Sequence, residues 1–196
     1  MNAMRVLVLY AHPVETSYCA ALHRATVDGL KAAGHEVDDC DLYAEGFDPV
    51  MSRQERLAYH DETACTKPVQ AYVDRLRAAE GLVVCAPVWN YGYPAILKGF
   101  LDRVFLPGVS FRLVNGKAAP NLQHIRKMAT VTTYGGSRFR TILMGDAPRK
   151  WFKRTMRALI YPFGRAKYLA LYDMNRADDA KRAAFLARVG ETMRAF

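Results

Sequence analysis

Three short segments of this chain carry side chains that are suited to binding a ligand. The first is residues 12–19, His-Pro-Val-Glu-Thr-Ser-Tyr-Cys, which end where helical periodicity begins. A helix N-terminus presents unpaired backbone N–H groups and the positive end of the helix dipole, and the hydroxyls of Thr16 and Ser17 add donors. The segment therefore predicts an anion site, with a simple helix cap as the alternative. It lacks the glycine patterns of a Rossmann dinucleotide turn and of a P-loop.

The second segment, residues 87–94, is dominated by aromatic side chains. Trp89, Tyr91 and Tyr93 could form one wall of a slot for a planar ring, while core or interface packing is the alternative use of such residues. The third segment, residues 132–137, offers two threonine hydroxyls and a glycine pair that permits close backbone approach. Together the three segments favour a phosphate at the first and a flat ring between the second and the third.

Each segment follows an apolar run that is predicted to be a buried strand. These runs are residues 5–10, 82–86 and 127–133, and short runs rich in apolar and β-branched residues are typical of the buried strands of parallel sheets. In open α/β sheets, ligands bind beyond the carboxyl ends of the strands, at the topological switch point. The sequence therefore predicts one α/β domain over residues 4–196, with five parallel strands and a site at their carboxyl ends.

The other elements are predicted with less support from the pattern. Weaker strands are expected over residues 35–42 and 166–172, and helices over 17–33, 68–79, 94–104 and 149–160. In the 149–160 helix, an apolar stripe of Phe152, Met156 and Leu159 extends to Phe163. The last helix is expected to begin with Asn175 as its N-cap. Residues 44–67 show no clear periodicity, and a segment of that kind is often functional or an interface.

Composition and charge narrow the classes of function. The chain has 196 residues, is 51% hydrophobic and has a formal net charge of +9. Residues 137–182 hold 12 Lys or Arg against 4 Asp, which favours anionic partners, but no nucleic-acid motif is present and no nucleic-acid partner is expected. The four scattered cysteines predict reduced thiols and no metal site. Since no signal peptide or long apolar run is present, a cytoplasmic location is expected.

From Arg5 to about Ser137, the sequence resembles a known family, the flavodoxin-like NAD(P)H:quinone oxidoreductases. This family includes DT-diaphorase, the bacterial modulators of drug activity and the ancillary oxidoreductases of glutathione-gated potassium channels. The most specific match is residues 94–105, Pro-Ala-Ile-Leu-Lys-Gly-Phe-Leu-Asp-Arg-Val-Phe. The first segment and the Thr-Thr and Gly-Gly pairs match in the same order. The resemblance implies a doubly wound, five-stranded parallel sheet of order 2-1-3-4-5.

The resemblance also implies a flavin enzyme that transfers hydride from NAD(P)H, through the bound flavin, to a quinone-like acceptor. The residues matched to the flavin phosphate and ribityl chain are His12, Thr16, Ser17 and Tyr18. Those matched to the isoalloxazine are Pro87, Val88, Trp89, Asn90 and Tyr91. Those matched to its pyrimidine edge are Thr132, Thr133, Gly135 and Gly136. A homodimer is implied, with residues 47–67 as the expected contact, and FMN is expected over FAD because no adenine-binding element is seen.

The sequence departs from the family pattern at three places. Cys19 stands where the family often has Asn, which weakens the grip on the pyrophosphate of FAD. Tyr134 is inserted between the Thr pair and the Gly pair. Phe139 and Arg140 occupy the neighbourhood where some members have a Tyr and a His that relay charge during hydride transfer. No catalytic acid or base is therefore assigned.

The basic second half leaves several interpretations open. The 149–160 helix could present a solvated basic face, Arg138, Arg140 or Arg149 could meet the phosphates of NADPH, or the region could attach to a membrane surface, for which the helix offers little apolar reach. The functional alternatives are a flavodoxin-like electron carrier, a regulatory subunit of a membrane transporter, and an azo or nitro reductase. The positive charge disfavours the electron carrier, since such carriers are usually acidic.

Overall fold

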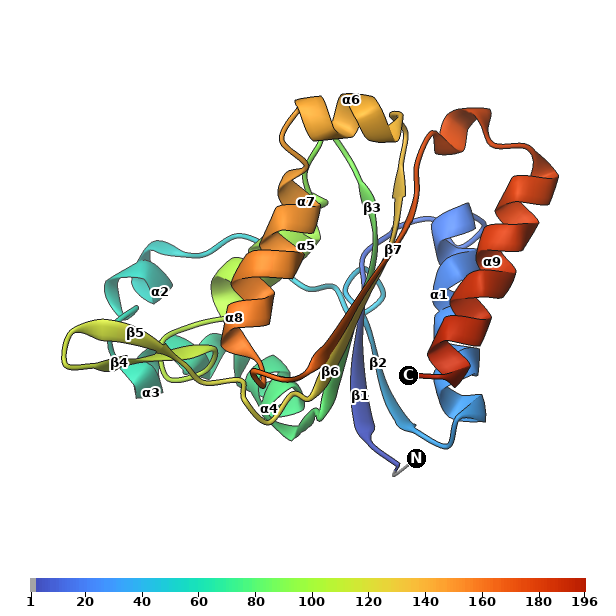
Figure 1. The fold of residues 1–196 in the computed structure, drawn as a ribbon. Helices are drawn as coiled ribbons and strands as arrows, with labels where there is room; N and C mark the ends of the chain where they lie inside the picture. The colour runs from blue at the N-terminus through green and yellow to red at the C-terminus, as the bar shows by residue number, and fades with distance from the viewer. Residues whose placement is uncertain (1–2) are drawn as a thin grey trace.

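The computed structural model describes residues 3–196, so Met1 and Asn2, which the predicted domain excludes, lie outside the described part. One parallel sheet is formed by β1 (Arg5–Tyr10), β2 (Glu36–Asp41), β3 (Gly81–Val88), β6 (Lys127–Tyr134) and β7 (Arg165–Leu171). Its order is β2-β1-β3-β6-β7 (Figure 1). This is the predicted order 2-1-3-4-5, renumbered because a separate hairpin interrupts the chain. The α/β class and the flavodoxin-like fold are confirmed.

Two helical layers cover the sheet because its central strands are apolar on both faces. In β1, Val6 and Val8 point into one hydrophobic core, while Leu7 and Leu9 point into the other. Helices α1 (Tyr18–Ala32) and α9 (Asp179–Arg194) cover the first face (Figure 1). The second face is covered by α4 (Gln70–Ala78), α5 (Ala95–Val104) and the helical segment between residues 147 and 159. The carboxyl ends of the parallel strands therefore lie along one edge of the sheet, between the two helical layers.

The segment without periodicity folds into short helices that depend on tertiary contacts. They are α2 (Arg53–Leu57), α3 (Glu62–Thr66) and the 3-10 turn η1 (Lys67–Val69). A capping box formed by Ser52 and Glu55 begins α2. The same Glu55 forms an ion pair with the buried Arg103 of α5 at 2.7 Å. Such short helices are marginal alone, which explains why periodicity does not reveal them.

A hairpin and a short helix are absent from the sequence-based prediction. The hairpin pairs β4 (Phe111–Val114) with β5 (Lys117–Pro120), and its turn places Asn115 and Gly116 at positive φ. Asn-Gly between two strand-like runs is a strong hairpin signal, so the sequence did contain the information. The short helix is α6 (Arg138–Leu143), whose N-cap Ser137 accepts a hydrogen bond from the Arg140 amide.

One predicted helix start is wrong, and another is shifted by two residues. Asp178 is the N-cap of α9 because its carboxylate accepts from the Lys181 amide at 2.7 Å, whereas Asn175 lies in the 3-10 turn η3 (Met174–Arg176). The helix expected over 149–160 begins earlier, as α7 (Ala147–Lys150), and continues as the π-helical η2 (Trp151–Met156) and α8 (Arg157–Leu159).

The apolar stripe predicted for this helix is also shorter than expected. Phe152 and Met156 are buried in the core, but Phe163 is 85% exposed because the helix ends before it. Within residues 3–196, no helix combines the length and the hydropathy needed to cross a bilayer.

Candidate functional site

The carboxyl ends of β1, β3 and β6 bring the three predicted segments to one edge of the sheet. Parallel pairing aligns Tyr10 with Cys85 at the end of β1, and Val88 with Tyr134 at the end of β3. The His12 ring meets the Trp89 ring edge to face, with centroids 5.7 Å apart. The first segment thus contacts the second at the carboxyl ends of β1 and β3. These neighbouring strands form the topological switch point, because the strand order reverses between them.

The second segment also approaches the third. A Cβ placed on Gly136 would lie 3.8 Å from the Tyr91 hydroxyl oxygen and 3.8 Å from the Thr141 hydroxyl oxygen. Gly136 therefore leaves a small space beside the Tyr91 side chain that a larger residue would begin to fill. The three segments therefore adjoin one another along this edge of the sheet.

The first segment has the geometry of an anion site at the start of α1. Ser17 is the N-cap, and its hydroxyl oxygen accepts a hydrogen bond from the Ala20 amide at 3.1 Å. The amides of Tyr18 and Cys19 precede Ala20, in the first turn, where backbone N–H groups have no intrahelical acceptor. They are the donors that this helix offers to a phosphate. The Thr16 side chain is exposed next to them.

His12 is held in one tautomer by its own loop. Its Nδ1 accepts a hydrogen bond from the Val14 amide at 3.0 Å, so the neutral ring carries its proton on Nε2. Partial burial lowers the pKa of His12 below its ordinary value near 6.5. His12 is therefore a neutral Nε2–H donor at neutral pH. The Tyr18 hydroxyl donates to the Arg182 carbonyl of α9 at 2.7 Å, so its side chain anchors α1 and only its backbone faces the site.

The aromatic segment is a tight two-residue turn. Trp89 and Gly92 exchange two backbone hydrogen bonds of 3.0 and 2.9 Å, and the residues between them, Asn90 and Tyr91, both have positive φ. This is the geometry of a type I′ turn, made here without glycine at either central position, and such backbone strain is concentrated at functional sites. The turn leaves the Trp89 side chain 42% exposed. Pro87 is buried and Val88 half-buried at the end of β3 beneath it.

In the third segment, the glycines face outward and the threonines do not. Thr132 and Thr133 are buried within β6, and the Thr132 hydroxyl donates to the Ala86 carbonyl of β3 at 2.6 Å. Gly135 is exposed, and a Cβ on it would lie 3.2 Å from the Asn175 side-chain nitrogen. Thr132 therefore ties β6 to β3 with its side chain, while the exposed backbone of this segment is at Gly135.

The inserted Tyr134 belongs to a buried polar network beneath the glycines. Its hydroxyl donates to the Asp146 carboxylate at 2.8 Å and contacts the Tyr168 hydroxyl, and its ring stacks on Tyr172 at 4.6 Å. Burial raises the pKa of Tyr134 far above its ordinary value, so the phenol stays protonated. The network anchors both ends of the 135–145 loop. Asp146 lies 12 residues from Tyr134, and no sequence pattern connects the two.

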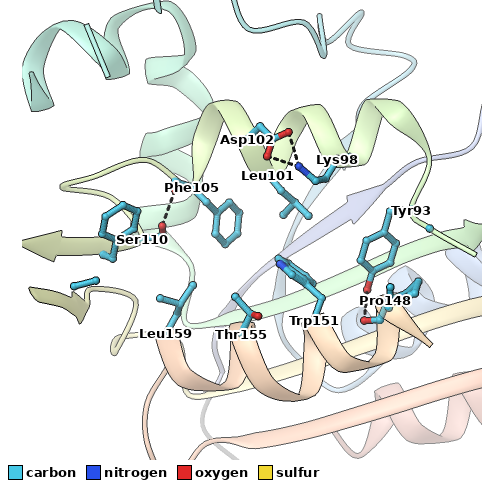
Figure 2. Close-up of a pocket in the computed structure, with 14 residues that line it drawn as sticks. Tyr93, Lys98, Leu101, Asp102, Phe105, Ser110, Pro148, Trp151, Thr155 and Leu159 are labelled. Carbon is cyan, nitrogen blue, oxygen red and sulfur yellow. Dashed lines mark hydrogen bonds and ion pairs between the residues drawn. The ribbon is translucent and has the colours of Figure 1, made fainter. Parts of the chain in front are cut away.

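Two cavities adjoin the site. One, of about 380 Å³, lies beside His12 between the first segment and the end of β2. The other, of about 630 Å³, begins at Gly92 and Tyr93 and continues between α5 and the α7–η2–α8 segment. Figure 2 shows Leu101 of α5 and Phe105, which directly follows α5, facing Trp151 and Leu159 across it. The Tyr93 hydroxyl donates to the Pro148 carbonyl at 3.2 Å and closes one end.

The fold and its three loops define a flavodoxin-like protein. Residues 4–192 match the family model described as "flavodoxin-like fold", and the chain belongs to that family. The flavodoxin-like family membership predicted from residues 5–137 is confirmed, and the match extends well beyond them.

Individual relatives agree with this assignment. The chain is 31% identical to NAD(P)H dehydrogenase [quinone] 1 of Rattus norvegicus, over 70% of this chain and 56% of that protein. The chain spans about half the length of the first curated relatives that it matches. Its fold is similar to that of Smu.1420 from Streptococcus mutans UA159, with a TM-score of 0.84 and 28% identity over 98% of this chain and 100% of that one. It is also similar to NAD(P)H:quinone oxidoreductase from Methanothermobacter marburgensis, with a TM-score of 0.83 and 25% identity over 98% of both chains.

Proposed function

We propose that this protein is a flavin-dependent NAD(P)H:quinone oxidoreductase that takes hydride equivalents from NAD(P)H and reduces a quinone-like acceptor. The observation that carries the proposal is the meeting of an anion-binding helix start, an exposed aromatic turn and an open glycine pair at the switch point of the sheet. The names of the rat relative and of the Methanothermobacter protein, both of which are quinone oxidoreductases by name, support the same reaction.

The residues at the site fit a flavin mononucleotide. His12 Nε2–H, the Thr16 and Ser17 side chains and the first-turn amides of α1 would hold the phosphate. Pro87, Val88 and the turn from Trp89 to Tyr91 would support the ring, and the backbone at Gly135 and Gly136 would face its pyrimidine edge. A bound flavin supplies the two-electron chemistry, and this chain orients the ring and shields it from water.

We propose FMN in preference to FAD. The buried Cys19 offers no amide side chain for a second phosphate. FAD remains the alternative, because the 380 Å³ cavity beside His12 leaves space for a second phosphate and an adenosine next to the proposed FMN phosphate. Extraction of the bound flavin followed by chromatography against FMN and FAD standards decides between them.

The larger cavity supports an apolar, aromatic acceptor. It adjoins the proposed ring wall at Gly92 and is lined by aromatic and aliphatic side chains, with the Lys98–Asp102 ion pair on α5 also lining it (Figure 2). Thr155 is an exposed lining residue, so Thr155→Trp fills the cavity from its edge. We expect a several-fold higher KM for menadione and an unchanged flavin content. Lys153→Trp, two residues before Thr155 and outside the lining, is the matched control.

We also propose a homodimer and a cytoplasmic location. The segment over residues 47–67 keeps large apolar side chains exposed, among them Val50 and Leu57, as a subunit contact requires. Sedimentation velocity of Leu57→Asp against the unaltered protein tests the contact. All four cysteines are free and buried, which suits a reducing compartment.

One experiment tests the function directly. The purified protein is examined for a flavin absorption spectrum and mixed anaerobically with NADH or NADPH, and menadione is then added. Rapid bleaching followed by reoxidation supports the proposal. A colourless protein that takes up neither FMN nor FAD contradicts it. A flavoprotein that NAD(P)H fails to reduce would instead be an electron carrier or a regulatory subunit, and faster turnover with azo or nitro compounds than with quinones would make it a reductase of those compounds.

A further inference from the structure

The carboxyl edge of the sheet carries an exposed apolar helix face that the proposed reaction does not use. In α6, Phe139, Ile142 and Leu143 follow the i, i+3, i+4 spacing of one face. The exposed fractions are 79% for Phe139 and 70% for Leu143, and the neighbouring Met144 is exposed as well. Thr141 points the other way, is buried, and donates to the Ser137 carbonyl. Large apolar side chains gathered on a surface in this way mark an interaction site.

Cationic side chains surround this face. Four of them share a shallow cavity with Ile142, namely Arg149, Lys150, Lys153 and Arg154. Two more, Arg138 and Arg140, are exposed on α6 itself. The acidic residue within 137–160 is Asp146, which is buried and paired with Tyr134. The surface formed by α6 and the adjoining turns of α7 and η2, here called the α6 face, is therefore apolar at its tip and positive around it.

We propose that the α6 face docks on the surface of an anionic lipid bilayer. Exposed Phe and Leu side chains enter the boundary between headgroups and acyl chains, and the surrounding Lys and Arg side chains meet the lipid phosphates. The helix over residues 149–160 carries the charge but little exposed apolar surface, and α6 supplies that surface beside it. The exposed apolar side chains of α6 and the cations of the 149–160 helix come together only when the chain folds.

Other binding partners would match either the apolar side chains or the positive charge of the α6 face, but not both. Two copies that packed this face against itself would bring like charges together in an isologous contact, which is unfavourable. Nucleic acid would pair with the cations and leave the exposed Phe139 and Leu143 without a role. An anionic bilayer uses the apolar tip and the positive surround together.

Vesicle co-sedimentation tests the proposal without flavin or electron donor, so its outcome is independent of the proposed enzyme function. The intact protein is mixed with vesicles of phosphatidylcholine alone, or of phosphatidylcholine with phosphatidylglycerol, at low and high salt. We expect binding to the anionic vesicles and weaker binding at high salt, because salt screens the attraction. Leu143→Ser should lower the partition coefficient about tenfold, and Arg154→Gln about fivefold.

The matched controls lie elsewhere on the molecule. Phe163→Ser removes an aromatic side chain that is 85% exposed but lies just before β7, at the opposite end of the strands from α6. Arg112→Gln removes an exposed cation from the hairpin. Both should bind anionic vesicles like the unaltered protein. Thermal melts of all four variants confirm that they remain folded.

Three results would overturn the proposal. The first is equal binding, or none, to the two kinds of vesicle. The second is a loss of binding with Arg154→Gln but not with Leu143→Ser, which would indicate general polyanion binding. The third is a change of oligomeric state by Leu143→Ser in sedimentation velocity, which would make the α6 face a contact between copies.

Discussion

Trp89 is held at the site by the turn that follows it and not by burial in a core. Its ring contacts His12 on one side, and a large part of it stays open to solvent. Asn90 and Tyr91, both at positive φ, form the turn that pairs the Trp89 backbone with Gly92. At the scale of single residues, the groups that we propose to face a ligand are therefore the indole, an imidazole N–H and backbone amides.

Trp89→Ala should raise the dissociation constant for FMN about tenfold, because stacking of a planar ring on an aromatic side chain contributes about 1–3 kcal/mol. The melting temperature of the flavin-free protein should change little, since the side chain is 42% exposed. Quenching of FMN fluorescence measures the affinity, and Trp89→Phe, which keeps an aromatic ring, should retain most of it. Unchanged affinity in the Ala variant would show that the ring wall is assigned wrongly.

Tyr134→Phe should lower the free energy of unfolding by about 1–3 kcal/mol, because the buried Asp146 carboxylate loses the phenol that donates to it. Tyr172→Phe is the control, since the Tyr172 hydroxyl only accepts a 3.3 Å bond from Arg149 and the residue is half-buried. Urea denaturation of the three proteins compares them. Equal losses in both variants would contradict the role given to the Asp146 pair.

At the scale of elements, α1 takes its place from a close crossing with α9. Gly29 of α1 lies against α9, where a Cβ would come within 2.7 Å of the Met193 Cβ and 2.9 Å of the Gly190 carbonyl oxygen. The Tyr18 hydroxyl bond to Arg182 joins the same two helices near the other end of α1. The helix start that faces the proposed phosphate is thus held in place through α9.

Gly29→Ala should destabilise the fold by about 1–3 kcal/mol, because α1 and α9 must move apart to admit the methyl group. Gly190→Ala is the matched change on α9, where the nearest atom to the new Cβ is the flexible end of Arg194 at 3.6 Å. It should be neutral or stabilising by up to about 1 kcal/mol, from higher helix propensity. The denaturant midpoints of the two variants are compared with that of the unaltered protein. An unchanged midpoint for Gly29→Ala would contradict the close crossing of α1 and α9.

The elements also show where sequence reasoning succeeds. β1 and β3 are predicted correctly because strands buried on both faces are apolar at every position. α2, α3 and α6 are missed because each has only five or six residues, too few to show a helical period. In α2, Glu55 is also paired with the distant Arg103 of α5, a contact that local sequence does not reveal. The start of α9 is misplaced because Asn175 and Asp178 are both good N-caps, and only the folded backbone selects between them.

At the scale of the whole molecule, stability should fall in mild acid through His35. This side chain is 6% exposed, and its Nδ1 accepts from the Met4 amide at 3.3 Å. Burial, followed by the nearby charge of Lys127, lowers the pKa of His35 below its ordinary value. Below about pH 6.5, the unfolded chain therefore binds a proton that the folded chain does not. The contribution of His35 to the free energy of unfolding is therefore full above that pH and is lost as the pH falls. The lowered pKa of His12 makes the stability depend on pH in the same direction.

The measurement is the free energy of unfolding in urea at pH 7 and at pH 5. The unaltered protein should lose stability between the two, and His35→Gln should lose less, since glutamine does not titrate in this range. An equal loss in the two proteins would show that His35 does not carry the pH dependence.

The sequence by itself determined that this chain forms a parallel α/β sheet and which three segments meet at its carboxyl edge, because buried strands and the residues that follow them are local patterns. Which side chains of those segments are already bonded within the fold, and so unavailable to a ligand, depends on tertiary packing. The Thr132 hydroxyl is used by Ala86 and the Tyr18 hydroxyl by Arg182, so their side chains serve the scaffold. These partners lie 46 and 164 residues away, and hydrogen bonds over such separations are set by packing and not by the neighbouring sequence.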